Sequence, residues 1–295
     1  MNDKYAIGIA LLVISTVLLP FHLIFIWFFL SKKEYRRHMA FKIMASLGII
    51  DCFHILSHFA TGLMTVLASN INTVIERVWT LVLTSWVGMA GMIFILSLNR
   101  LVVLTSARLA SRSERQIYSL CAVVWTTYLG VLALHMTNEG AINYRIRESS
   151  FSYALTDLNM LYAEVYESYW ILICLSMSFL CYLVIFLWIL LNKQFRPKHI
   201  KIAGREVKIL VQAIIIFGYL TTLRATWHYG TSWYMKHVEV VNTLNILTSL
   251  VGGVNPVLYL CFNSGLRAQF FALFGLRQKN HTGKSCTVTV LGVHK

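Results

Sequence analysis

The sequence predicts an all-α membrane protein: a seven-transmembrane helix bundle with a short amphipathic C-terminal surface helix. Of its 295 residues, 57% are hydrophobic and only 13% are charged, more apolar surface than a soluble domain can bury. The hydrophobic residues lie in runs of about 20 or more, the length with which a helix crosses about 30 Å of hydrocarbon. No alternating pattern of the kind that builds a barrel is present, so helices must satisfy the backbone polar groups in lipid.

Seven hydrophobic runs follow one another, and each predicts one membrane-spanning helix. The first run is too long for a signal-peptide core and precedes no cleavage pattern, so we expect it to be the first span. We expect a membrane domain over residues 1–262 and a cytoplasmic helix and tail over 263–295. In chain order, the predicted spans are residues 6–30, 41–66, 79–105, 116–136, 168–192, 207–229 and 238–262.

Lys and Arg are distributed unequally between the segments that connect these spans. Twenty of the 26 lie in residues 32–42, 100–115 and 193–208 and in the tail from Arg267. Loops rich in these bases stay on the cytoplasmic side, which predicts a multi-pass plasma-membrane protein with its N-terminus outside and its C-terminus inside. The net charge of +14 is concentrated on the predicted cytoplasmic side. Because membrane topology and contact with anionic lipid explain this asymmetry, we expect the lipid bilayer as a partner and no nucleic acid.

Two segments outside the spans have patterns of their own. The longest outer segment, residues 137–167, mixes aromatic and acidic residues and predicts either a lid over the bundle or an irregular solvated connector. Residues 264–277 read SGLRAQFFALFGLR, an amphipathic pattern between basic residues that predicts a helix on the inner membrane surface. No cysteine lies in an outer loop, so we expect no extracellular disulfide. The sequon at Asn280 and the lone tail cysteine Cys286 fall on the cytoplasmic side.

Asp51 lies about ten residues into the second span, far from either interface. A carboxylate at that depth needs a partner or a function, and we expect Asn255 and Ser97 to contact it. Two interpretations are open. Asp51 either belongs to a hydrogen-bonded cluster that joins helices, or it is part of a conformational switch or an ion site.

Two further residues suggest a mechanism. Arg100 ends the third span in LSLNRLVV, where it either snorkels to the headgroups or pairs at the cytoplasmic mouth with Glu206 of the sixth span. Pro256 removes one backbone hydrogen bond from the seventh span and bends it, which predicts a two-state element.

Together these features resemble the rhodopsin-like G-protein-coupled receptors. The resemblance rests on LxxxD at Leu47 and Asp51, on Arg100, on Trp125 in the fourth span and on NPxxY at 255–259. Within that class, FKIMASLGIIDCFHILSHFATGLM, LSLNR and NPVLYLCFNSGLR resemble the nematode serpentine chemoreceptors, notably the Srt and Srx families. The resemblance implies a chemosensory receptor that binds a small extracellular molecule within the bundle and signals to a cytoplasmic heterotrimeric G protein.

The resemblance also implies roles for single residues. Asp51, Asn255 and Pro256 would form a central polar switch, and Arg100 and Tyr259 would rearrange as the sixth span moves outward to admit the G protein.

The chain departs from the family pattern at several positions. Asn99 replaces the acidic residue that usually precedes the arginine, so a resting lock must use Glu206. The usual asparagine of the first span is replaced near His22, and the sixth span lacks the aromatic-plus-proline switch. Ile75 and Glu76 stand where an outer cysteine is usual.

Polar and aromatic side chains in the outer half of the spans predict a ligand pocket. His54 and His58 have the one-turn spacing of a metal pair, but no third ligand accompanies them and buried hydrogen-bonded histidines are commoner, so we expect no metal and no cofactor. Arg224 either binds an anionic ligand or snorkels outward. The candidates, chosen by depth, are His54, His58, Trp86, Tyr169, Trp170, Arg224, His228 and Asn245.

Other functional classes fit the sequence less well. It has no paired catalytic carboxylates, nucleophile elbow, phosphate loop or metalloprotease motif, so we expect no enzyme. The seventh span has no lysine for a retinal Schiff base, which disfavours a light sensor. Two alternatives stay open: a membrane transporter or ligand-gated channel, and a receptor-like protein that has lost coupling.

Overall fold

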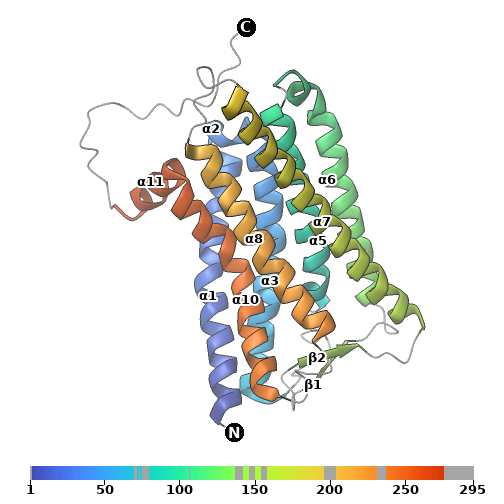
Figure 1. Cartoon of the computed structure of the whole chain (residues 1–295). Coiled ribbons are helices and arrows are strands. Elements are labelled where there is room, and N and C mark those ends of the chain that lie inside the picture. The colour runs from blue at the N-terminus through green and yellow to red at the C-terminus, as the bar shows by residue number, and fades with distance from the viewer. Residues whose placement is uncertain are drawn as a thin grey trace.

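The computed structural model is a bundle of long helices that run roughly side by side (Figure 1). We call the end that carries the N-terminus the outer end and the opposite end the inner end, after the predicted orientation. Some side chains within helices, mainly near their ends, lie outside the described part. The structure describes residues 2–69, 72, 74, 80–105, 107–136, 142–145, 150–153, 158–195, 204–230 and 237–275.

The seven long helices follow the order of the seven predicted spans. Six of them are long and apolar enough, over their described residues, to cross a membrane. The remaining one, α8, takes the sixth place in the bundle and packs against α7 and α10 (Figure 1). The elements are α1 (Asn2–Ser31), α2 (Lys33–Arg36), α3 (Met39–Leu67), α5 (Thr80–Thr105), α6 (Ala107–Met136), β1 (Ile142–Arg145), β2 (Ser150–Tyr153), α7 (Leu158–Phe195), α8 (Gly204–Tyr229), α10 (Val238–Phe262) and α11 (Ser264–Leu273).

The main difference from the predicted boundaries lies between the fourth and fifth spans. The strands β1 and β2 form an antiparallel hairpin in which Ile142 lies opposite Tyr153 and Arg145 opposite Ser150. α7 begins at Leu158, and the part of it that is apolar enough to cross a membrane begins at Glu164, close to the predicted span boundary at residue 168. The last part of the expected connector is therefore helix, because a helix can continue past the hydrocarbon layer with polar side chains that hydropathy does not count as a span.

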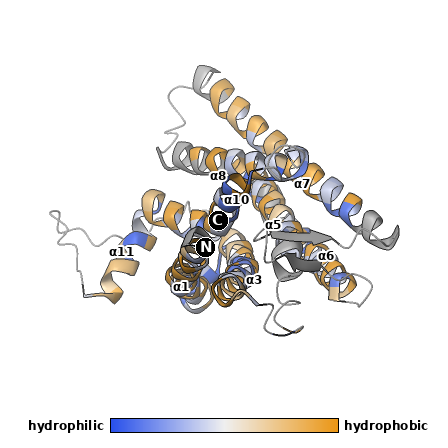
Figure 2. Cartoon of the chain, turned by 90° about the horizontal axis from the view of Figure 1, so that it is seen from below, coloured by the Kyte–Doolittle hydropathy of each residue, from blue (hydrophilic) through white to orange (hydrophobic). Residues whose placement is uncertain are grey.

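The helices pack in a fixed pattern around the centre of the bundle. α1 lies against α3 and α10, whereas α5 contacts α3, α6 and α7. Hydrophobic residues also cover surfaces that face away from the other helices, as on α7, where Leu172 and Ile173 are 53% and 59% exposed (Figure 2). Such outward apolar surfaces are those of a protein whose solvent is lipid.

The tightest helix crossing joins α1 and α3. A Cβ atom on Gly62 would lie 2.9 Å from the backbone oxygen of Gly8, closer than side chains tolerate. Two glycines at this point therefore let the backbones meet, as small residues do in membrane-helix interfaces.

The inner end is held by a cluster of aromatic rings from α1, α2, α10 and α11, which we call the inner aromatic cluster. The ring of Tyr259 packs edge-on against Phe25 and Phe29, with centroid distances of 5.5 and 5.7 Å. Asn263 ends α10 and starts α11, because its side-chain oxygen accepts hydrogen bonds from the backbone N–H groups of Gly265 and Leu266. The cluster consists of Phe25, Phe28, Phe29, Tyr35, Tyr259 and Phe270, with further residues packed around it.

Candidate functional site

Three buried polar side chains meet midway along the bundle, and we call them the central polar cluster: His22 of α1, Asp51 of α3 and Asn255 of α10. Asn255 Nδ2 donates a hydrogen bond of 2.9 Å to Asp51 Oδ2. His22 Nδ1 lies 3.9 Å from the same oxygen. Asp51 is fully buried, and its partner across 204 positions in the chain is the one expected from the sequence.

Pro256 of α10 accounts for a hydrogen bond that His22 makes to the backbone of α10. In a helix, the carbonyl of Gly252 would accept the N–H of the residue four positions later, but Pro256 has no N–H. His22 Nε2 donates a hydrogen bond to this carbonyl from the neighbouring helix. His22 therefore satisfies the backbone group that the proline leaves open, as the absence of water in a bilayer requires.

The second expected partner of Asp51 does not contact it. Ser97 Oγ donates a hydrogen bond of 2.7 Å to the carbonyl of Phe94 in its own helix. Asp51 Oδ1 is buried and has no hydrogen-bond partner among the described residues. The prediction for Ser97 was wrong because a serine within a helix can bond back to its own preceding turn.

A second polar layer lies nearer the outer end, around His54. His54 Nδ1 is 2.9 Å from Ser85 Oγ of α5, and its Nε2 is 2.9 Å from the backbone oxygen of Thr248 of α10. The indole of Trp227 on α8 donates a hydrogen bond of 2.9 Å to Thr248 Oγ1. One histidine and one threonine thus link α3, α5, α8 and α10.

Most of the other predicted pocket residues border this layer. His58 stacks edge-on against His54 with ring centroids 4.6 Å apart, and Trp86 lies edge-on to His54 at 6.2 Å. Asn245 is buried, and Trp170 on α7 donates a hydrogen bond to the carbonyl of Val87. These residues fill the space between the helices with aromatic and neutral polar groups.

Three predicted pocket residues lie elsewhere. Tyr169 is 62% exposed, because neighbouring positions on a helix point about 100° apart and Trp170 takes the inward direction. His228 is exposed near the outer end of α8. Arg224 is half-buried and donates a hydrogen bond of 3.1 Å to Ser168 Oγ of α7.

Arg100 lies at the inner end of α5, half-buried, after the buried Asn99. The side chain of Glu206 lies outside the described residues, so the predicted pair between Glu206 and Arg100 stays a prediction. Asn280 and Cys286 also lie outside the described residues.

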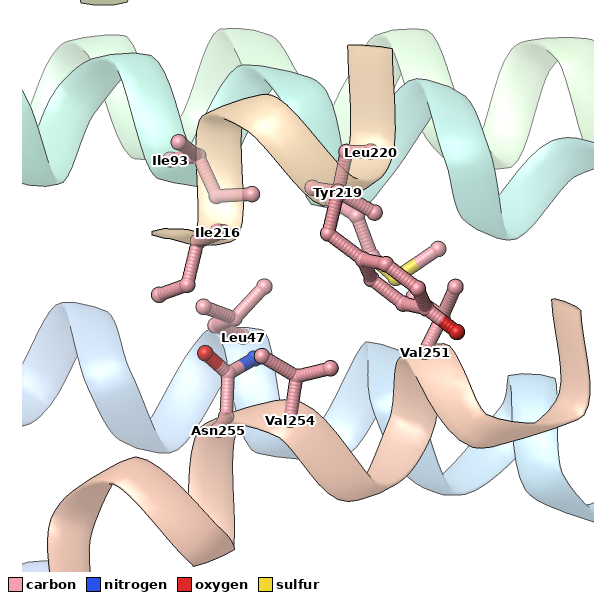
Figure 3. Close-up of a pocket in the computed structure, with 9 residues that line it drawn as sticks. Leu47, Ile93, Ile216, Tyr219, Leu220, Val251, Val254 and Asn255 are labelled. Atoms are coloured by element: carbon pink, nitrogen blue, oxygen red, sulfur yellow. The ribbon is translucent and has the colours of Figure 1, made fainter. Parts of the chain in front are cut away.

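A small apolar cavity of about 10 Å³, room for about one water molecule, lies between α8, α3, α5 and α10 (Figure 3). Ile216 and Leu220 of α8 stand on one side, and Leu47, Val254 and the amide of Asn255 stand on the other (Figure 3). Of the central polar cluster, Asn255 therefore forms part of the wall that faces α8. Its lining comprises Leu47, Met89, Ile93, Ile216, Tyr219, Leu220, Val251, Val254 and Asn255.

Sequence reasoning missed one buried pair. His135 Nε2 lies in direct contact with Glu167 Oε1, and both residues are 1% exposed. Glu167 fell in the expected solvated connector, and only the extension of α7 before residue 168 reveals that it lies inside the bundle.

The arrangement agrees with known proteins at the level of family and of fold. The model of the serpentine type seven-transmembrane G-protein-coupled chemoreceptors named Srt matches residues 1–283. The chain belongs to the Srt chemoreceptor family. The crystal structure of squid rhodopsin is similar to this receptor, with a TM-score of 0.74 and 15% sequence identity, over 93% of this chain and 86% of that one. No curated protein matches the receptor in sequence.

Membership of this family agrees with the geometry of the bundle. The Srt receptor has the fold of rhodopsin, with the short helix α11 after the seventh long helix. Its family and fold are those of membrane-spanning receptors and not of enzymes. The predicted fold class and the predicted family are thus confirmed.

Proposed function

We propose that this Srt receptor binds a small extracellular molecule in the outer half of its bundle and couples to a heterotrimeric G protein at its inner end. The observation that carries the proposal is the placement of the central polar cluster. Asn255, which donates a hydrogen bond to Asp51, stands next to Pro256 and also lines the cavity beside α8. A change of hydrogen bonding at the bend can therefore alter how α8 packs.

The packing of α8 supports an outward movement of its inner end. In its outer half, Tyr219 OH donates a hydrogen bond of 2.5 Å to the carbonyl of Leu247, and Trp227 bonds Thr248. The cavity extends along α8 from Ile216 to Leu220, and Tyr219 itself forms part of its lining. Among the described residues, the hydrogen bonds between α8 and α10 thus lie at the cavity and outward of it, and we infer that the inner end of α8 is the part that can swing with the least rearrangement.

The proposed orientation places the N-terminus outside the plasma membrane and the basic loops in the cytoplasm. With this orientation, Arg100 lies near the cytoplasmic end of α5. We assign residues 1–262 to the receptor domain and 263–295 to the cytoplasmic helix and tail. Ligand-binding residues in this proposal are the inward-facing members of the predicted set: His54, His58, Trp86, Trp170 and Asn245.

A cell-based assay of second messengers tests the coupling. The wild-type receptor, Arg100→Ala and the exposed-residue control Arg115→Ala are compared for basal and odorant-evoked signal per receptor at the cell surface. We expect Arg100→Ala alone to lose the signal. Equal signals from all three would remove the G-protein mechanism, and a glycan on Asn280 in intact cells would reverse the orientation.

A further inference from the structure

The outer part of α7 carries three side chains that bond three different helices within four residues. Glu167 contacts His135 near the end of α6, and Ser168 accepts a hydrogen bond from Arg224 of α8. Trp170 donates one of 3.1 Å to the carbonyl of Val87 in α5. We call residues 167–170 the α7 hub.

The contact between His135 and Glu167 joins two helices that otherwise have little contact with one another. Among the described residues, α6 and α7 both pack along α5 and hardly touch one another. The pair is nevertheless almost completely buried, with side-chain exposures of 0% and 1%. A buried imidazole and carboxyl group at such a place hold to each other, because neither has water as an alternative partner.

The α7 hub also lies close in the chain to the outer loop, by which we mean the connection between α6 and α7 that contains the hairpin β1–β2. His135 is followed by Met136, the last residue of α6, and the hairpin β1–β2 comes next in the chain. α7 then enters from Leu158 and reaches Glu167 after about 13 Å of helix, at about 1.5 Å per residue. A movement of the hairpin therefore reaches the bundle through the two helix ends that the pair joins.

We propose that the α7 hub couples the outer loop to α8, with His135 and Glu167 as positioning residues that fix α7 so that Ser168 can hold Arg224. The link from Glu167 to α8 runs through the adjacent Ser168, since Glu167 itself contacts α6. The signalling role of this coupling rests on the proposed function. The coupling itself is a property of the bundle and needs neither ligand nor G protein.

Hydrogen exchange of the purified receptor in lipid nanodiscs, read by mass spectrometry, tests the coupling. Glu167→Gln removes the carboxyl group with little change of shape, and Glu164→Gln makes the same change one turn earlier on α7 as the control. We expect Glu167→Gln to speed amide exchange about tenfold at the outer end of α6 and also in the last turns of α8, because a broken buried pair opens its surroundings. Glu164→Gln should leave both unchanged.

Two further variants separate coupling from a local packing defect. The exchanged pair, His135→Glu with Glu167→His, should restore slow exchange in both helices, because the imidazole and the carboxyl group again face one another. Ser168→Ala should speed exchange in α8 and leave exchange in α6 slow. This variant still tests the proposal if the variants at His135 and Glu167 fail to fold. Unchanged α8 exchange in Glu167→Gln or in Ser168→Ala would overturn the proposal. Because no G protein takes part, that outcome leaves the proposed function standing.

Discussion

α1, α3 and α10 are joined by three polar contacts at two levels, whereas α8 packs against α10 and shares a small apolar cavity with α3 and α10. His22 bonds Gly252, Asn255 bonds Asp51, and His54 bonds Thr248. α8 has hydrogen bonds to α10 only in its outer half, among the described residues. In lipid, where apolar burial hardly favours one helix contact over another, polar contacts and close packing decide which helices stay together. Under the proposed function, the three-helix unit is the fixed part of the receptor and α8 is the movable part.

The largest loss of stability is expected where the backbones of α1 and α3 approach most closely. Gly62→Leu should lower the free energy of unfolding by about 3 kcal/mol or more, because a side chain there meets the backbone of α1. Gly218→Leu on α8 is the control, since nothing lies within 4 Å of a Cβ at that position. Thermal unfolding in detergent measures both. Equal losses would show that the two regions do not differ in packing.

The contact between His22 and the open carbonyl of Gly252 should have the next largest effect. His22→Phe keeps a ring but removes the donor, and should cost about 2 kcal/mol, as an unsatisfied buried carbonyl does. Pro256→Ala supplies an N–H to that carbonyl, so the same substitution should cost clearly less in the Pro256→Ala background. Unfolding of the four proteins in mixed micelles gives the coupling energy. A coupling energy of zero would contradict the assigned role of His22.

A smaller loss is expected for the hydrogen bond within the central polar cluster. Asn255→Ala should cost about 1.5 kcal/mol, because it removes the hydrogen bond to the Asp51 carboxylate. Asn242→Ala is a matched control in the same helix, buried to the same degree but with no partner for its Oδ1 atom among the described residues. The expected order of stability is wild type, Asn242→Ala, Asn255→Ala, and the reverse order of the two variants would count against the cluster.

The smallest effect concerns the cavity beside α8. Val254→Ile adds one methyl group to the cavity wall and should stabilise the resting receptor by about 0.5 kcal/mol while lowering basal signalling. The same substitution at Val257, whose side chain is 54% exposed, adds the group to the outer surface and should change neither quantity. An increase of basal signalling in Val254→Ile would indicate that the cavity closes, and does not open, on activation.

The sequence predicts the spans and the Asp51 contact for the same physical reason. Lipid cannot solvate a polar group, so long apolar runs must be helices and a deep carboxylate must find a partner. Asn255 was predictable as that partner because it is a polar side chain at similar depth in the seventh span.

Other features could not be predicted from local pattern. The open carbonyl of Gly252 follows from Pro256, but which helix supplies the donor depends on how α1 packs against α10. Glu167 was misplaced because hydropathy marks where a helix leaves the membrane and not where the helix begins. The inward direction of Trp170 and the outward direction of Tyr169 depend on the rotation of α7, which two adjacent aromatic residues leave undetermined.

The difference in mobility between α8 and the three-helix unit is the central claim, and spin-label distances measure it directly. With Cys261 as the remaining native cysteine, a second label is placed on α8 at Val211 or on α1 at Leu30, all of them exposed positions. In nanodiscs with G protein added, we expect the distance from Val211 to Cys261 to lengthen or split into two populations, while the distance from Leu30 to Cys261 stays single. Equal, unchanged distributions for both pairs would contradict the account.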